Sequence, residues 1–311
     1  MTNNPPGQRG PPRRMSSVLR PPTSVDENLR RAALALEAAR VDSPRLTAEV
    51  LLAHVSRLTR TQLLSRLEQN LSSDALAHFD RLMGRATSGE PLAYLTGLRE
   101  FFGLDFFVDA HVLIPRPETE LLVDLALRSP LLARAKENSE PIRILDVGTG
   151  SGCIAVTLAV GLPSAHVTAV EVSPEALAVA RRNAERHKVA YRVTLLQSNL
   201  LSAVTRSGQL SAFELLCANL PYIPSDELRQ LPVAKHEPHV ALDGGPDGLE
   251  VIRRFLLEAP RVVAPHGRVL LEVGATQGAA VNDLAHAAFP QGIVEVHKDL
   301  AGLDRVVSIA P

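Results

Sequence analysis

The decapeptide FELLCANLPY, residues 213–222, joins an apolar run to the turn Asn-Leu-Pro-Tyr. Such a run predicts a strand inside a parallel sheet, because helices cover both faces of these sheets. Pro221 has no N–H to donate to a neighbouring strand, so we expect the strand to end just before it. Ligands of open α/β sheets bind beyond the carboxyl ends of the strands. The turn therefore predicts either a small polar pocket or, since Asn and Pro are common turn residues, only a strand end.

The sequence around this strand alternates apolar runs with helical patterns from Ile142 onward, which predicts a doubly wound parallel sheet of the α/β class. The last two strands are joined by a loop too short for a helical crossover, so we expect them to pair antiparallel. This topology resembles that of Rossmann-like class I methyltransferases. The expected strands are 143–147, 166–172, 192–197, 213–218, 268–273, 293–297 and 304–309.

The part of the chain before the sheet predicts a small all-α bundle over residues 23–88. Ser24 and Glu27 form a capping box in front of an amphipathic helix. We expect the bundle to recognise the substrate, because it carries no catalytic constellation of its own. Further helices are expected to begin at Pro44, Thr59 and Ser72.

The remaining segments divide the chain further. Residues 1–22 are rich in Pro and Arg and contain no acidic residue, which predicts a disordered tail. Residues 89–115 form an expected linker, in which phenylalanines around Gly103 indicate a β-hairpin. Residues 116–311 form the expected sheet domain.

The composition is that of an ordinary globular protein, with 45% apolar and 22% charged residues. The net charge of −1 gives no overall attraction to nucleic acid or anionic lipid. Cys153 and Cys217 fall in expected core segments, which favours a reducing compartment. The sequence shows no metal-site spacing, no apolar run long enough to cross a membrane and no secretory signal. We expect a cytoplasmic protein that uses no metal and no membrane.

A glycine-rich turn, DVGTGSG at residues 146–152, follows the first expected strand of the sheet. Its glycines let the backbone approach a ligand, and the next helix offers free N–H groups at its start. The third glycine stands one residue too early for the dinucleotide pattern G-x-G-x-x-G. Glu171 ends the next strand, where an acid accepts hydrogen bonds from ribose hydroxyls. Taken alone, the glycines could form a packing turn and Glu171 could cap a helix. At this spacing, the glycine turn and Glu171 together favour a cofactor site. The expected binding residues of the turn are Gly148, Thr149, Gly150, Ser151 and Gly152.

The end of the third strand carries the expected adenine contacts. The amide oxygen of Asn199 is an acceptor for the adenine amino group, and Leu200 can pack on the ring. Asn199 alone is equally typical of a turn.

Several stretches together resemble the release-factor glutamine N5-methyltransferases, also called HemK-like proteins, from about Ser24 to the C-terminus. The resemblance implies S-adenosylmethionine as methyl donor. It also implies, as acceptor, the glutamine of the Gly-Gly-Gln loop of bacterial-type peptide release factors, which the helical domain helps to hold. The stretches are DSPR at 42–45, PLAYLTG at 91–97, REF at 99–101, IPRPETE at 114–120, DVGTGSG at 146–152, NLPY at 219–222 and ALDGG at 241–245.

The turn at residues 219–222 suits the chemistry that this resemblance implies. An amide nitrogen is a poor nucleophile, because its lone pair is delocalised into the carbonyl group. Asn219, which also borders the expected cofactor site, and the carbonyl of Leu220 can accept its two N–H groups and orient it. Pro221 stiffens the turn, and Tyr222 can stack on the flat amide.

The sequence departs from the family pattern twice and leaves some roles open. Leu220 stands where the family usually has Pro, and Asn199 stands where it usually has Asp; both positions keep an acceptor. By resemblance, Arg116, Glu118 and Thr119 line the methionine end of the donor, although helix capping explains Glu118 equally well.

Two other functions fit parts of the pattern. An N6-adenine methyltransferase acting on RNA or DNA would face the same planar NH₂ group, but it should carry a basic groove. An inactive cofactor-binding scaffold would not need the intact Asn219, Pro221 and Tyr222. We expect the release-factor enzyme, acting as a monomer without direct contact to nucleic acid.

Overall fold

The structure, a computed structural model, describes residues 24–129, 131, 141–205 and 213–311. The expected tail at 1–22 lies outside the described residues. The chain divides into two compact units, residues 1–89 and 90–311, and each is described by itself.

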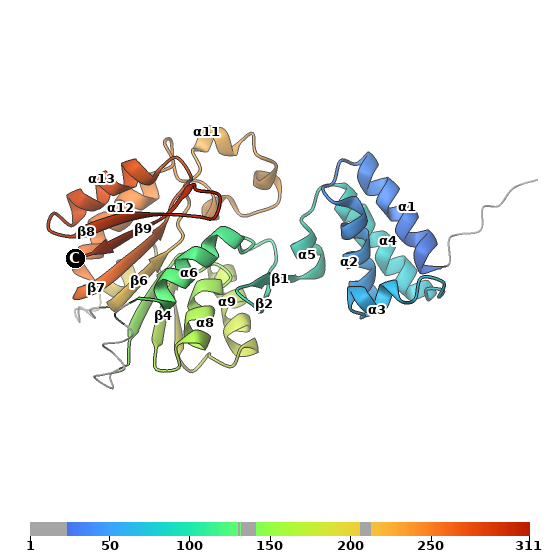
Figure 1. Cartoon of the computed structure of the whole chain (residues 1–311), viewed down its shortest axis with the longest axis horizontal. Helices are drawn as coiled ribbons and strands as arrows, with labels where there is room; N and C mark the ends of the chain where they lie inside the picture. The colour runs from blue at the N-terminus through green and yellow to red at the C-terminus, as the bar shows by residue number, and fades with distance from the viewer. Residues whose placement is uncertain (1–23, 130, 132–140, 206–212) are drawn as a thin grey trace, which may run out of the picture. The chain divides into compact units, whose positions relative to one another are not determined.

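The first unit contains four helices in its described part (Figure 1). The expected capping box forms at the start of the first of them. Ser24 accepts a hydrogen bond from the Glu27 N–H, and Glu27 accepts one from the Ser24 N–H, each at 3.2 Å. Thr59 and Gln62 form a second reciprocal pair of this kind, whereas Ser72 only accepts a hydrogen bond from the Ala75 N–H. Pro44 begins the second helix, as expected. The helices are α1 (Val25–Ala38), α2 (Pro44–Ser56), α3 (Arg60–Leu64) and α4 (Ser73–Thr87).

The second unit is built on a seven-stranded sheet with the order β5-β4-β3-β6-β7-β9-β8. Strands β3 to β7 run parallel, and β9 pairs antiparallel with both β7 and β8, so the predicted α/β topology is confirmed. The strands are β3 (Arg143–Val147), β4 (His166–Glu171), β5 (Val193–Gln197), β6 (Phe213–Ala218), β7 (Val263–Glu272), β8 (Ile293–Lys298) and β9 (Asp304–Ala310). Strand β7 begins five residues earlier than expected, because its pairing with β6 continues past a register shift near Phe213.

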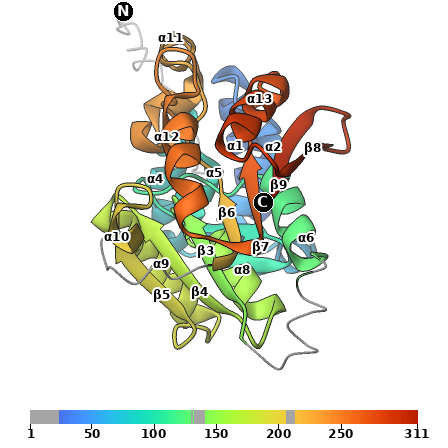
Figure 2. The same ribbon diagram turned by 90° about the vertical axis from the view of Figure 1, so that its left-hand side faces the viewer.

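Helices cover both faces of the sheet, as the apolar run at residues 213–218 predicts (Figures 1 and 2). Leu215 and Cys217 pack on the side of α6, α8 and α9, whereas Leu216 and Ala218 pack on the side of α12 and α13. The alternation follows from the two-residue period of a strand. The helices are α5 (Leu92–Thr96), α6 (Glu120–Leu127), α8 (Cys153–Gly161), α9 (Pro174–Arg186), α10 (Ser202–Thr205), α11 (Ser225–Leu228), α12 (Glu250–Glu258) and α13 (Gly278–Ala288).

Shorter elements complete the second unit. Strands β1 (Leu98–Phe101) and β2 (Leu104–Phe107) form an antiparallel hairpin around Gly103. Four 3₁₀ turns are described: η1 (Pro117–Thr119), η2 (Pro232–Lys235), η3 (His239–Ala241) and η4 (Ala259–Arg261).

The register of the central strands brings the expected site residues to one edge of the sheet. Val147 of β3 pairs with Val170 of β4 and with Ala218 of β6. The glycine turn, Glu171 and Asn219 therefore follow three neighbouring strand ends, where α/β sheets bind ligands.

Candidate active site

A cavity of about 520 Å³ opens at this edge of the sheet. It is bordered by the glycine turn, by the ends of β4 and β5, by the turn after β6 and by a loop between α11 and α12. Of the expected site residues, it is lined by Gly148, Gly150, Glu171, Asn199, Leu200, Asn219, Leu220 and Pro221. Thr149, Ser151, Gly152 and Tyr222 do not line it.

The glycine turn needs its glycines for three different reasons. Gly148, Gly150 and Gly152 all have positive φ, at +74°, +53° and +80°, where side chains are strained. A Cβ at Gly152 would lie 3.2 Å from the Ala180 Cβ, so this glycine lets α8 approach α9. A Cβ at Gly150 would meet nothing closer than 4.0 Å, so the turn is open where it faces the cavity.

Gly148 lies where the glycine turn meets the turn after β6. A Cβ at this position would lie 3.3 Å from Cδ2 of Leu220 and 3.5 Å from the Asn219 carbonyl oxygen. The Leu220 side chain is buried, with 2% exposed. The Leu that replaces the family's usual Pro therefore packs against the glycine turn.

We expect Gly148→Ala to lower methyl transfer by about tenfold or more, because the added methyl group displaces Leu220 and the turn that carries Asn219. Gly103→Ala is the matched control, since Gly103 has φ +75° but no atom within 4 Å of the added Cβ. Both variants should lose a similar stability of about 1–2 kcal/mol from backbone strain, measured by urea unfolding. Equal transfer rates for the two variants would contradict the coupling between Gly148 and Leu220.

Glu171 is held by backbone N–H groups at the edge of the cavity. Its Oε2 accepts from the Gly150 N–H at 2.9 Å. Its Oε1 accepts from Val172 N–H at 2.8 Å and from Ser173 N–H at 3.1 Å. The carboxylate is therefore fixed in place, and its remaining lone pairs can accept from a ligand.

Asn199 lies at the same edge but already has a partner. Its Oδ1 accepts a hydrogen bond at 2.9 Å from the guanidinium of Arg254, a residue of α12 that also lines the cavity. Leu200 has φ +50° and contributes to the cavity wall beside it. The acceptor that the sequence assigned to adenine is thus shared with a cation that sequence reasoning did not identify.

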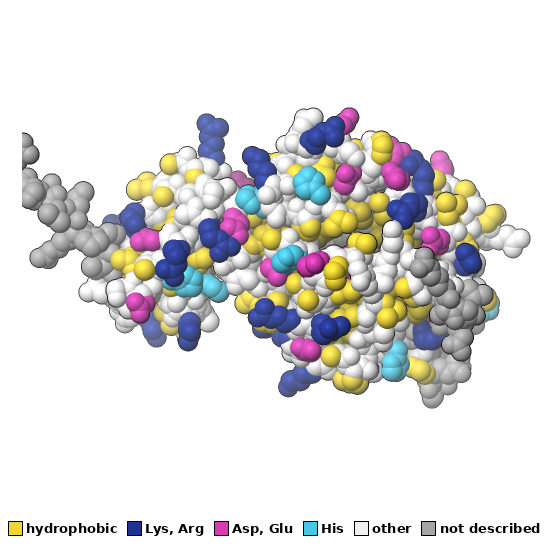
Figure 3. All heavy atoms as spheres, turned by 180° about the vertical axis from the view of Figure 1, so that it is seen from behind, with side chains coloured by type: hydrophobic (Ala, Val, Ile, Leu, Met, Phe, Trp, Pro, Cys, Tyr) yellow, Lys and Arg dark blue, Asp and Glu magenta, His cyan; other side chains and the backbone are white. Residues whose placement is uncertain are grey.

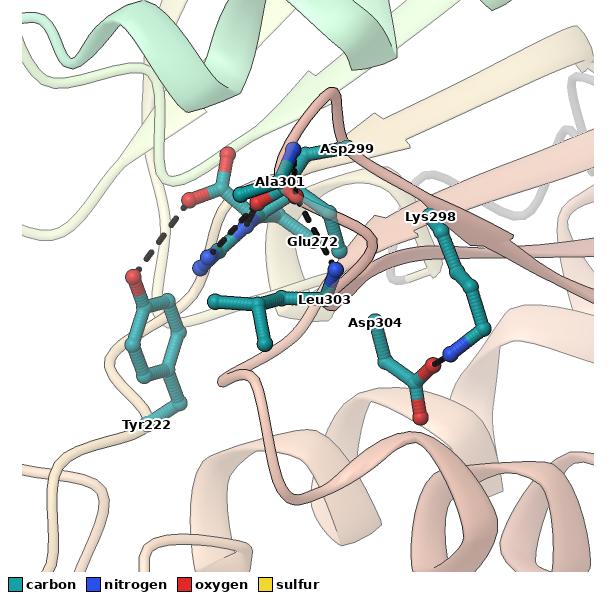
Figure 4. A network of polar contacts seen from close by, with 8 residues as sticks. Tyr222, Glu272, Lys298, Asp299, Ala301, Leu303 and Asp304 are labelled. Carbon is teal, nitrogen blue, oxygen red and sulfur yellow. Dashed lines mark hydrogen bonds and ion pairs between the residues drawn. The ribbon is translucent and has the colours of Figure 1, made fainter.

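Asn219 and Tyr222 each contact a buried polar residue behind the cavity. The Nδ2 group of Asn219 donates to Oγ1 of Thr119 at 3.1 Å. The Tyr222 hydroxyl donates to Oε1 of Glu272 at 3.5 Å, at the end of β7 (Figure 4). Burial raises the pKa of Tyr222 to about 12, so this hydroxyl keeps its proton at neutral pH. The stacking role expected for Tyr222 remains a prediction.

Two buried carboxyl groups flank the site, and both have strongly raised pKa values. Asp146 is fully buried, which raises its pKa to about 7. The Thr149 hydroxyl and the Ala155 N–H donate hydrogen bonds to its Oδ2, and these partly offset the rise in pKa. Burial likewise raises the pKa of Glu272 to about 7. Within the described residues, Oδ1 of Asp146 and Oε2 of Glu272 have no hydrogen-bond partner.

These two groups predict that the free energy of unfolding falls as the pH rises from 5 to 8. Their folded pKa values, about 7, exceed the ordinary values of 3.8 and 4.5, so between these limits the folded state binds more protons than the unfolded state. Their stabilising contribution is complete below the ordinary values and is lost as the pH rises through 7. Urea unfolding should show a decrease of about 5 kcal/mol between pH 5 and pH 8, roughly half of it from each group, so Asp146→Asn should roughly halve the decrease. An equal slope in the variant would contradict the assignment.

The loop between α11 and α12 is fastened to the segment before α6. The buried carboxylate of Glu237 accepts from the Ile114 N–H at 3.0 Å and from the Arg116 guanidinium at 2.5 Å. Pro238, Val240 and Asp243 of the same loop line the cavity. Arg116 therefore holds the cavity wall through Glu237, a contact between residues 121 positions apart that sequence spacing does not indicate.

Three further features concern the surface charge, metal ligands and membrane-spanning helices. On the face shown in Figure 3, Lys and Arg side chains lie interspersed with Asp and Glu over both units. The described part of the chain contains no group of three or more His, Cys, Asp or Glu placed to hold a metal ion. No helix within the described ranges is long and apolar enough to cross a membrane.

Comparison with known proteins adds two family matches and several relatives. Residues 27–97 match the PrmC N-terminal domain, and residues 138–301 match a methyltransferase domain. The chain is 46% identical to the release factor glutamine methyltransferase of Moorella thermoacetica, over 87% of this chain and 92% of that protein. It is 42% identical to that of Nitratidesulfovibrio vulgaris, over 90% of this chain and 92% of that protein.

A solved structure, the delta-N METTL16 MTase domain, superposes with a TM-score of 0.51 at 17% identity. The alignment covers 67% of this chain and 89% of that one. At this identity the likeness concerns the fold alone.

Proposed function

The chain belongs to the release factor glutamine methyltransferase family, and from this premise we propose that it methylates the side-chain amide nitrogen, N5, of one particular glutamine. The acceptor is the glutamine of the Gly-Gly-Gln motif in bacterial-type peptide chain release factors, and the donor is S-adenosylmethionine. The observation that carries the proposal is the orientation of Asn219. Asn219 lines the cavity, and its NH₂ group is bound to Thr119, so its side-chain oxygen remains as an acceptor.

The residues along one half of the cavity fit the methyl donor. The open face of Gly150 leaves room for a ligand against the backbone, and Glu171 is fixed where it can accept from ribose hydroxyls. Asn199 and Leu200 would border the adenine ring. When bound, S-adenosylmethionine supplies an electrophilic methyl group on a sulfonium.

The other half of the cavity fits the acceptor amide. The Asn219 oxygen and the Leu220 carbonyl would accept the two N–H groups of the glutamine, which disfavours delocalisation of its nitrogen lone pair. Pro221 has a fixed φ and limits the motion of the turn. Orientation of this kind lowers a barrier without requiring a strong general base, because the proton can leave after methyl transfer.

The first unit is the proposed site of release-factor recognition, since the PrmC N-terminal domain match covers most of it. A protein substrate also agrees with the net charge of −1 and with the mixed charges on the one face shown in Figure 3, since a nucleic-acid enzyme should carry a basic groove. We further propose that the protein acts as a monomer in the cytoplasm.

A transfer assay with methyl-labelled S-adenosylmethionine tests this proposal. Purified release factor and bulk RNA are offered separately, and the labelled protein is digested to locate the label. Label on the Gly-Gly-Gln peptide at the glutamine side chain is the expected result. Label on adenine of RNA alone would overturn the proposal in favour of an N6-adenine methyltransferase. Binding of the donor without transfer to either acceptor would indicate a scaffold.

A further inference from the structure

We propose that Thr119 and Glu272 are positioning residues that fix which end of the Asn219 amide faces the acceptor. This inference rests on the proposed function, since it explains why the Asn219 oxygen, and not its NH₂ group, faces the glutamine amide. An Asn side chain can rotate by 180° about its last bond, which exchanges the oxygen and the NH₂ group. Only one of the two orientations can accept a hydrogen bond from a glutamine NH₂.

The contact with Thr119 selects between these orientations. Thr119 is buried, with 2% exposed, and its Oγ1 accepts from Nδ2 of Asn219 at 3.1 Å. A hydroxyl has one proton to donate and two lone pairs. If its proton is donated elsewhere, it can only accept from Asn219, and the Asn219 oxygen must then lie on the opposite side of the amide.

We infer that Glu272 takes this proton, because both side chains are buried, and both Asn219, the partner of Thr119, and Tyr222, the partner of Glu272, belong to the turn after β6. The Glu272 side chain is buried, with 1% exposed, and hydrogen bonding from the Thr119 hydroxyl partly offsets the effect of burial on its pKa. The same carboxyl accepts from the Tyr222 hydroxyl (Figure 4). As a carboxylate, Glu272 is a pure acceptor and orients both hydroxyl groups toward itself.

A protonated Glu272 would reverse this polarity, because a carboxylic acid can donate to Thr119. The Thr119 proton could then be donated to the Asn219 oxygen, which would turn the Asn219 NH₂ group toward the acceptor. The charged groups that act on Glu272 are Arg305 of β9, which favours the carboxylate, and Glu118 of η1, which opposes it. Arg305 is itself paired with Asp299 at 3.1 Å.

The first test removes only the hydroxyl, with Thr119→Val. We expect kcat for the release factor to fall about tenfold or more, while the affinity for S-adenosylmethionine changes less than about twofold. Thr119→Ser should restore most of the rate because it restores the hydroxyl. Thr157→Val is the matched control, since Thr157 is a buried threonine whose hydroxyl has no partner among the described residues. It should leave kcat unchanged.

The second test uses the pH dependence of kcat. With the Glu272 pKa at about 7, the wild-type rate should rise about tenfold between pH 6 and pH 8. Glu272→Gln keeps the shape but can donate from its amide at every pH. This variant should therefore be slow, and its rate should lack the rise, while thermal melting reports that it is folded.

The outcomes separate the two proposals. Suppose that the wild type methylates the release factor, but kcat is unchanged in Thr119→Val and the pH profile is unchanged in Glu272→Gln. This result overturns the positioning role and leaves the proposed function standing. A loss in Thr119→Val that Thr119→Ser does not recover also overturns it, because packing would then explain the loss. A wild type that transfers nothing to the release factor overturns the proposed function and this inference together.

Discussion

Asn219→Ala is expected to reduce kcat for release-factor methylation by about 10²–10³-fold, the range found when one preorganised hydrogen-bonding group is removed from a reacting centre. The variant loses the side-chain acceptor that orients the glutamine nitrogen, and it also leaves the buried Thr119 hydroxyl without its donor. The Leu220 carbonyl alone would then hold the amide, which can turn about that single hydrogen bond.

The affinity for S-adenosylmethionine, measured by calorimetry, shows whether Asn219 also belongs to the donor half of the cavity. We expect Kd to rise by less than about fivefold, a change of about 1 kcal/mol. Asn282→Ala serves as control, because Asn282 lies on α13 and does not line the cavity. A kcat within threefold of the wild type would exclude Asn219 from the reacting centre. A loss confined to donor affinity would place it in the cofactor site only.

Glu171→Ala is expected to weaken S-adenosylmethionine binding by about 100-fold, because hydrogen bonds to a charged group contribute about 1.5–3 kcal/mol. The variant removes the acceptor for ribose hydroxyls. It also releases three backbone N–H groups, those of Gly150, Val172 and Ser173, from the carboxylate that orders them. The glycine turn and the start of α9 would then lose their common anchor.

Two further variants distinguish these effects. Glu171→Gln keeps one acceptor oxygen and should weaken binding by only about tenfold, since a neutral acceptor is roughly half as strong. Glu175→Ala removes a carboxylate from the first turn of α9, outside the cavity lining, and should change Kd by less than about twofold. Donor affinity within threefold of the wild type in Glu171→Ala would contradict a ribose contact, and would leave Glu171 as an anchor of the backbone alone.

The sequence by itself determined the sheet unit, because strands and helices have different apolar periods and the loops limit how strands can pair. The short loop between residues 298 and 304 requires an antiparallel pair, and β8 and β9 form one. The apolar run at 213–218 requires helices on both faces, and its residues alternate between two cores. The family resemblance, carried by stretches such as IPRPETE and NLPY, is confirmed by relatives at 42–46% identity.

The tertiary structure alone decided which polar groups stand behind the expected site residues. Glu272 follows an apolar run and gives no pattern that distinguishes it from an exposed strand end, yet the fold buries it beside Tyr222. Arg254 and Glu237 are likewise ordinary charged residues in the sequence. Their contacts are with Asn199, 55 positions away from Arg254, and with Arg116, 121 positions away from Glu237. Periodicity and motifs report the neighbours of a residue along the chain. The pairing, burial and pKa of a charged group depend instead on contacts that exist only after the chain has folded.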